Sequence, residues 1–215
     1  MTAEMTGPCL LRDGSMVVIR QVECGDASLL ADGFARLSVR SRRSRFMRDK
    51  NRLTEAELRF LTCVDHHDHE ALGALGPDGR GAGVARYIRD AEEPRAAEIA
   101  VTVVDEWLGR GLGSKLLALL CERARAEGVY WLTAQVAYDN HVSSKMVRNA
   151  GGVLVSEGQG VREYEIWLVP QHAQDLARWL RGLEHTESGQ PASSGRRGRK
   201  ERGQTRLWRA PKPLT

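Results

Sequence analysis

Three glycines within five residues stand directly before a leucine-rich run. The segment from Asp105 to Gly128 reads DEWLGRGLGSKLLALLCERARAEG, with glycines at positions 109, 111 and 113. A helix start leaves its first N–H groups unpaired and carries a partial positive charge. Glycines at such a start let the backbone approach a ligand closely, so the segment predicts a site for a phosphate or pyrophosphate group.

Other known phosphate-binding loops fit this turn less well. Its glycines lack the G-x-G-x-x-G spacing of dinucleotide-binding proteins, and Gly113-Ser114-Lys115 is not the G-K-[ST] of a P-loop. A tight connection between a strand and a helix, with no ligand at all, is the alternative interpretation. The residues around the turn therefore provide the evidence for choosing between a phosphate site and a plain connection.

Three other polar clusters are open to more than one interpretation. Residues 65–70 read DHHDHE, but no second histidine group lies at ligand spacing, which favours a polar turn or a wall of a substrate mouth over a metal site. The arginine-rich stretch 36–52 suits an anionic partner, such as an acidic substrate surface or the 3′-phosphate of a coenzyme A, or a solvated helix end and loop. The basic tail from residue 196, with eight Lys or Arg and one acid, suits either an acidic or nucleic-acid partner or plain disorder.

The apolar pattern predicts a single mixed α/β domain with a mostly antiparallel sheet flanked by helices. The expected strands are 17–22, 70–75, 83–88, 98–104, 130–137, 153–155 and 164–169; the expected helices are 26–37, 54–61, 112–124, 140–149 and 171–183. Strand–helix–strand order in the second half implies local parallel pairing. The turn Gly76-Pro77-Asp78-Gly79 predicts an antiparallel hairpin.

The chain divides by composition into four parts. We expect a flexible leader over residues 1–15, one folded domain over 16–170, an amphipathic helix over 171–184 and a basic disordered tail over 185–215. The net charge of +4 is concentrated in the tail, which leaves the folded part mildly acidic. A nucleic-acid-binding role for the domain is therefore disfavoured.

Composition predicts a cytoplasmic protein without a membrane anchor. Apolar residues make up 41% of the chain and charged residues 28%, and no apolar run is long enough to span a bilayer. The first residues lack the basic and apolar regions of a secretory signal. The four cysteines lie far apart with no C-x-x-C pair, so we expect reduced thiols and no disulfide or zinc framework. Nothing in the sequence indicates the oligomeric state.

The surroundings of the glycine turn resemble the acetyl-CoA signature of the GNAT N-acetyltransferase superfamily. That pattern is a strand ending in Val, then Q/R-x-x-G-x-G/A and a helix, and Arg110-Gly111-Leu112-Gly113 matches its core. Further on, Asn140-x-x-Ser143-x-x-Met146, ending in Ala150-Gly151-Gly152, resembles the family's N-x-x-A-x-x-L…L-G-F segment. The resemblance covers about residues 17–169. Stretches 44–46, 58–72 and 83–87 are similar to a bacterial stand-alone branch that includes protein lysine acetyltransferases.

The resemblance implies acetyl-CoA as co-substrate and no metal. Backbone N–H groups of one run would hold the pyrophosphate: Arg110, Gly111, Leu112, Gly113 and Ser114. A strand edge would pair with the pantetheine arm as an added strand and stabilise the thioester oxyanion through a backbone N–H: Thr102, Val103 and Val104. Asn140 would contact the arm where the neighbouring strand splays away. Leu108 replaces the usual Q/R, with little loss expected because backbone groups hold the ligand.

The resemblance also places the general base and leaves the general acid open. Glu98 matches the family position of the carboxylate that takes a proton from the attacking amine through water. A solvated glutamate at a strand end is the alternative for this residue. The tyrosine that often protonates the leaving thiolate falls at Val147, so water, Ser143, Ser144 or Tyr138 would have to serve.

These features favour an N-acetyltransferase that moves an acetyl group from acetyl-CoA to a primary amine by direct transfer. A protein lysine is the favoured acceptor. A small amine such as an aminoglycoside, a polyamine or an amino acid is the rival within enzymes. A non-catalytic acyl-CoA-binding regulator, which would use the basic tail to engage a partner, is the rival from another class.

Overall fold

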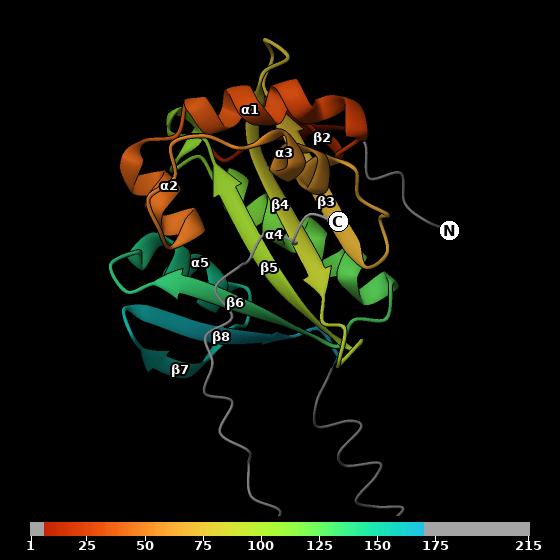
Figure 1. The fold of residues 1–215 in the computed structure, drawn as a ribbon, viewed down its shortest axis with the longest axis vertical. Coiled ribbons are helices and arrows are strands. Elements are labelled where there is room, and N and C mark those ends of the chain that lie inside the picture. Colours follow the sequence, from red (N-terminus) through yellow and green to blue (C-terminus); the bar gives the residue numbers. More distant parts are fainter. Residues whose placement is uncertain (1–6, 170–215) are drawn as a thin grey trace, which may run out of the picture.

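A single eight-stranded sheet runs through the middle of the molecule (Figure 1). The computed structural model describes residues 7–169. The strands lie side by side in the order β1-β2-β3-β4-β5-β6-β8-β7. Their bounds are Gly7–Leu10 for β1, Met16–Gln21 for β2, His69–Leu75 for β3, Gly81–Arg89 for β4, Ala96–Val103 for β5, Trp131–Ala137 for β6, Val153–Gly158 for β7 and Val161–Trp167 for β8.

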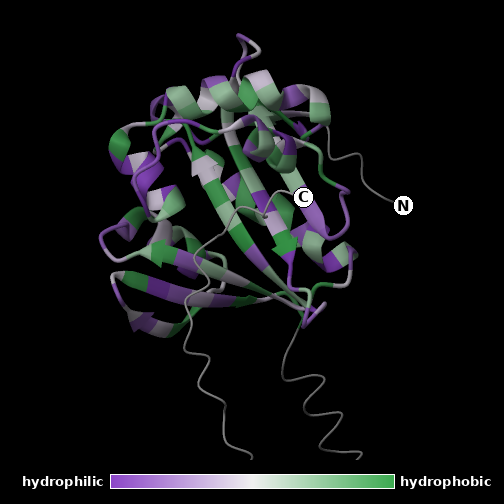
Figure 2. Cartoon of the chain, in the orientation of Figure 1, coloured by the Kyte–Doolittle hydropathy of each residue, from purple (hydrophilic) through white to green (hydrophobic). Residues whose placement is uncertain are grey.

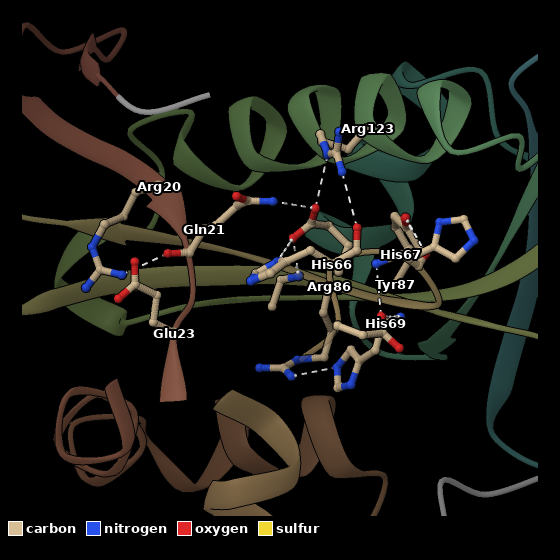
Figure 3. A network of polar contacts seen from close by, with 12 residues as sticks. Arg20, Gln21, Glu23, His66, His67, His69, Arg86, Tyr87 and Arg123 are labelled. Atoms are coloured by element: carbon tan, nitrogen blue, oxygen red, sulfur yellow. Dashed lines mark hydrogen bonds and ion pairs between the residues drawn. The ribbon is translucent and has the colours of Figure 1, made fainter. Parts of the chain in front are cut away.

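Helices cover both faces of this sheet. On one face lie α1 (Ala27–Ala35), α2 (Val39–Phe46) and α3 (Glu55–Thr62), and on the other lies α4 (Leu112–Ala126), as Figure 3 shows edge-on. Within the described residues the last helix is α5 (His141–Asn149), which follows β6. Two single-turn 3₁₀ helices precede α1 and α4: η1 (Cys24–Asp26) and η2 (Asp105–Trp107). This layered arrangement is the one that buries both faces of a central sheet.

The core lies between the sheet and α4. Leucines spaced along one side of α4 are at most 1% exposed because their helical spacing places them all against the strands: Leu112, Leu116, Leu117 and Leu120. Tyr87 of β4 and Leu72 of β3 are fully buried against the same cluster. Figure 2 shows hydrophobic residues along these central strands. The helix ends as expected at Gly128, whose φ of +79° is easily adopted only by glycine.

The sheet has one parallel junction, and it opens partway along. β5 pairs with β6 only over Ala96–Ile99 and Trp131–Ala134, while all other neighbouring strands are antiparallel. Beyond Ile99, β5 continues to Val103 with β4 as its only paired neighbour. The two strands are therefore unpaired beyond Ile99, which leaves an opening between β5 and β6 at the C-terminal end of β5. The start of α4 lies close to this end of β5.

Most of the expected elements are confirmed, with two additions. Residues 7–10 were expected to belong to a flexible leader, but they form β1 and pair with Met16–Ile19 of β2. Residues 39–46, for which a solvated helix end and loop was only one interpretation, form α2, which starts at a Ser38 cap whose hydroxyl accepts the N–H of Ser41. The expected parts 171–184 and 185–215 lie outside the described residues.

The expectation of reduced, unpaired cysteines is wrong for two of the four. Cys24 of η1 and Cys63, the residue that ends α3, form a disulfide across 39 residues of sequence. Cys9 and Cys121 are free and half-buried. The pair escapes sequence analysis because neither cysteine belongs to a recognisable spacing pattern, and only packing of α3 against η1 brings them together.

A buried carboxylate joins β3 to α4. Glu70 is fully buried, and its side chain accepts hydrogen bonds from Gln21 Nε2 at 2.9 Å and Arg123 Nε at 3.0 Å, while His66 Nδ1 lies 2.7 Å away (Figure 3). Arg123 also pairs with Glu127 at 2.8 Å. These contacts connect the polar 65–70 segment to the C-terminal half of α4. The segment is therefore a structural turn in this fold.

Candidate active site

The glycine turn forms the start of α4. Gly109 and Gly111 have φ values of +78° and +88°, in the left-handed region that favours glycine, and Gly111 is the N-cap residue of the helix. No side chain caps this end. The first N–H groups of α4, from Leu112 onward, therefore lack the side-chain cap that commonly serves a helix start.

Close packing also requires glycine at the next position. A Cβ placed on Gly113 would lie 3.1 Å from Met146 Sδ of α5 and 3.5 Å from a methyl group of Val103. The space between the start of α4, the end of β5 and α5 is thus only as wide as a glycine backbone permits. Glycine at this position therefore allows the start of α4 to pack directly against β5 and α5.

A cation that sequence analysis missed lies beside the turn. The Arg12 side chain passes within about 3.1 to 3.2 Å of the point where a Cβ of Gly111 would stand. The backbone N–H of Arg12 donates to the Arg110 carbonyl at 3.2 Å. Arg110 itself extends away, pairing with Asp13 at 3.3 Å and covering the Trp107 ring. Arg12 was assigned to the flexible leader, and only the β1–β2 hairpin brings it here.

The outer edge of β5 is unpaired at two of the three positions expected to contact the pantetheine arm. Thr102 and Val103 lie beyond the last pair with β6, so no strand covers their outer side. Val104 differs, because its N–H donates to the Ala82 carbonyl at 2.9 Å and its own carbonyl accepts the N–H of Trp107 at 2.8 Å. The edge available to an added strand therefore ends at Val103.

Asn140 lies on the far side of the same opening, where it begins α5. Its side-chain oxygen accepts the N–H of Ser143 at 3.0 Å, and its own N–H donates to Ala137. The residue thus caps α5, a role that Asn fills well. A contact between Asn140 and a cofactor stays a prediction.

Glu98 stands on β5 inside the paired part, directly before the opening. It lies opposite Ile88 of β4 and Thr133 of β6, and its side chain is exposed to solvent. The protein around it nevertheless raises the pKa of Glu98 above the ordinary 4.5, chiefly by desolvation. The charge of Arg45 acts in the opposite direction and that of Glu163 adds to the rise. A water-accessible carboxylate with a raised pKa is suited to accept a proton near neutral pH.

The candidate general acids have different surroundings. Val147, at the position of the usual tyrosine, is 2% exposed and belongs to the core. Ser144 is buried, whereas Tyr138 is half exposed at the end of β6 with the Arg162 guanidinium 4.1 Å from its ring centre. None of these contacts assigns the acid.

The described residues also bear on metal and membrane roles. Within residues 7–169, no group of three or more His, Cys, Asp or Glu side chains is arranged to hold a metal ion. In the 65–70 segment, the Asp65 carboxylate instead accepts the backbone N–H groups of His67, Asp68 and His69. No helix in the described range is both long and apolar enough to cross a membrane.

Comparison with known proteins supports the same architecture. The model of the Acetyltransferase (GNAT) family matches residues 35–151. Acetyltransferase Pat of Mycolicibacterium smegmatis is 34% identical over 167 residues, which are 76% of this chain and 49% of that protein. The chain thus spans about half the length of this relative. The L-methionine sulfoximine/L-methionine sulfone acetyltransferase of Pseudomonas aeruginosa is 36% identical over 83 residues, 39% of this chain and 42% of that protein.

A solved structure gives the same result for the fold. The GNAT domain of S. lividans PAT superposes with a TM-score of 0.72 at 28% identity, covering 77% of this chain and 98% of that one. The expected mixed α/β architecture is confirmed by this likeness. The family match extends over more than half of the residues, from the last residue of α1 to just beyond α5. With its open β5–β6 junction and uncapped glycine turn, this chain belongs to the GNAT acetyltransferase family.

Proposed function

We propose that the chain is an acetyl-CoA-dependent N-acetyltransferase with Glu98 as its general base and a protein lysine as its acceptor. The observation that carries the proposal is the position of Glu98, a carboxylate of raised pKa directly before the opening between β5 and β6. Membership of the GNAT family and similarity to Pat support the donor and the acceptor.

The residues around the opening fit the parts of acetyl-CoA. The N–H groups of residues 110–114 would hold the pyrophosphate, and Arg12 would add a positive charge beside it. The uncovered edge at Thr102 and Val103 would pair with the pantetheine arm. Gly113 keeps this helix start closely packed against Val103 at the end of β5 and against Met146 of α5.

The reaction then needs only one proton acceptor in the chain. A lysine ammonium has a pKa of about 10.4, so the amine must lose a proton before it attacks. Ionised Glu98 accepts that proton through a water molecule, and the amine nitrogen bonds to the thioester carbonyl carbon. A backbone N–H at the β5 edge stabilises the resulting oxyanion. The C–S bond then breaks, and the thiolate leaves and is protonated from solvent or a nearby hydroxyl.

Substitution of Glu98 tests the proposal. In E98Q the side chain keeps its shape but cannot take the proton, so transfer from isotope-labelled acetyl-CoA to lysines of a deacetylase-treated lysate should fall by about 10²- to 10⁴-fold. Binding of acetyl-CoA, measured by calorimetry, should change little. The matched control is E122Q, since Glu122 is an exposed glutamate on α4, which covers the opposite face of the sheet.

Each readout separates one alternative. Release of free CoA without label on protein would move the acceptor to a small amine, as in the Pseudomonas relative named above. Full transfer by E98Q would remove Glu98 from the mechanism. Binding of acetyl-CoA without transfer to any amine would favour a non-catalytic acyl-CoA-binding regulator.

A further inference from the structure

An apolar pocket lies between the sheet and the helices on the Glu98 side. Its empty volume is about 810 Å³, part of it open to solvent, and α1, α2 and α3 close it against β3, β4 and β5. Most of its lining is apolar, including Phe34, Leu61 and Val84. Thr102 of the uncovered β5 edge belongs to the same wall.

One cation in this wall is buried without a carboxylate. Arg86 of β4 is 3% exposed, and its Nη1 donates to the Leu61 carbonyl at 2.9 Å and faces His69 Nε2 at 3.1 Å (Figure 3). Burial and the charge of Arg86 lower the pKa of His69 to about 4, so this ring is neutral at neutral pH. Both partners of Arg86 are therefore uncharged, although a buried cation normally requires an anion.

A second guanidinium points to the same place. Arg45 of α2 lines the pocket, and within residues 7–169 neither it nor Arg86 forms an ion pair with a carboxylate. The charge of Arg45 acts on Arg86, whose pKa falls to about 9 through burial and this repulsion. By contrast, Arg20 in the same wall is paired with Asp26 at 2.6 Å.

These two cations lie next to the proposed point of transfer. Arg86 stands opposite Ala100 on β5, two residues from Glu98 and two from Thr102. Arg45 is close enough to Glu98 to influence its ionisation. An acyl group attached to a thioester at the β5 edge would thus have beside it an apolar pocket whose wall includes both guanidinium groups.

We propose that Arg45 and Arg86 form a carboxylate-binding subsite, and that it takes the free carboxylate of a dicarboxylic acyl group carried on coenzyme A. This deepens the proposed function, on which it rests. The chemistry of transfer is unchanged: the amine nitrogen bonds to the thioester carbon, the C–S bond breaks, and Glu98 receives the proton. The second carboxylate takes no part in bond changes and serves only for recognition. Its two oxygens match the planar guanidinium groups of arginine.

The test compares ligands of equal length and different charge. Dissociation constants for succinyl-CoA, butyryl-CoA and free succinate are measured by calorimetry on the full chain, with no acceptor present. Wild-type protein should bind succinyl-CoA at least about tenfold more tightly than butyryl-CoA, the gain expected of one charge-assisted hydrogen bond. R45Q should abolish this preference, while R43Q, which changes an exposed arginine of the same helix, should keep it.

A second variant and the binding of free succinate separate the possible outcomes of this experiment. R86M replaces the buried charge with an apolar side chain of similar length, so it should fold and also lose the preference. A third outcome is that free succinate binds and requires the two arginines, while succinyl-CoA is not preferred to butyryl-CoA. The carboxylate subsite would then stand, but its ligand would be a free carboxylate and not an acyl group on coenzyme A. Equal affinity for succinyl-CoA and butyryl-CoA, with no succinate binding, would overturn the proposal. Because none of these measurements involves transfer, failure of E98Q to lose activity would count against the general base alone.

Discussion

At the residue scale, the behaviour of Glu98 depends on charges from two other elements. Desolvation on the sheet surface favours its protonated form, the nearby Glu163 does the same, and Arg45 of α2 favours the ionised form. Only the ionised form can accept a proton from an amine. The rate of transfer should therefore fall as the pH drops through a pKa that lies above 4.5.

Removal of Arg45 should move this acidic limb upward in pH. Among residues 7–169, Arg45 is the cation whose charge lowers the pKa of Glu98, so its loss raises that pKa further and protonates the base at a higher pH. The measurement is kcat/KM with acetyl-CoA for wild type and R45Q between about pH 5 and pH 9, a range that spans the ordinary titration of carboxylates and histidines. R43Q should leave the limb in place, and an unmoved or lowered limb in R45Q would contradict the coupling.

At the residue level, sequence analysis can single out a residue that interrupts a simple pattern. Glu98 is a single acid that opens a long apolar strand, and the structure places it at the start of the opening. Arg86 interrupts an apolar strand in the same way, and that signal was available in Gly83–Ile88. Its proximity to Arg45 could not be predicted, because the two arginines are 41 positions apart in the sequence and only the fold brings them to the wall of one pocket.

At the element scale, α4 contacts the sheet through a buried polar group as well as through its leucines. Fully buried Glu70 on β3 receives Arg123 from α4, and Gln21 from β2 also donates to it. A buried ion pair contributes little against an apolar replacement, but removal of one partner leaves an uncompensated charge. The arrangement therefore makes the β3–α4 contact sensitive to single substitutions.

The R123M variant should have a lower free energy of unfolding than the double variant R123M/E70L. Loss of the guanidinium leaves Glu70 buried without its cation, which should lower the free energy of unfolding by about 3 to 5 kcal/mol. The additional change E70L should recover part of that loss in urea denaturation. R95M, which breaks an exposed pair with Glu93, should stay within about 1 kcal/mol of wild type. A double variant less stable than R123M would argue against an uncompensated charge as the cause.

Elements with strong apolar periodicity could be predicted, and those held by long-range pairing could not. The leucine pattern gives α4, and the capping box of Thr54 and Glu57 gives α3. β1 has only four residues and exists through its pairing with β2, so its sequence carries little signal of its own. α2 has no apolar stripe because four of its eight residues are arginines, and this defeats periodicity as a guide.

At the scale of the whole molecule, the helical layer over the Glu98 face is tied together covalently. The Cys24–Cys63 disulfide joins the start of α1, through η1, to the end of α3. These helices close the pocket that contains Arg45 and Arg86. The Cys24–Cys63 disulfide thus links two of the helices that form the wall of the proposed acyl subsite.

Reduction should loosen the fold without destroying it. A cross-link that closes a loop of this length contributes about 2 to 4 kcal/mol, mainly by restricting the unfolded chain. Treatment with dithiothreitol should lower the free energy of unfolding of the wild type by that amount and leave the C24S/C63S variant unchanged. Alkylation before and after reduction, read by mass spectrometry, should show two additional reactive thiols. Four reactive thiols in the untreated, unfolded protein would show that the bond does not form.

The opening between β5 and β6 has a consequence for how the molecule unfolds. Only four residue pairs join the five strands β1–β5 to the three strands β6–β8 across the middle of the sheet. Two parts connected by so short a ladder are able to lose structure as separate cooperative units. A ligand arm that bridges the opening would couple them. Ligand binding would then increase the cooperativity of unfolding of the entire domain. Two weakly linked unfolding transitions would become one.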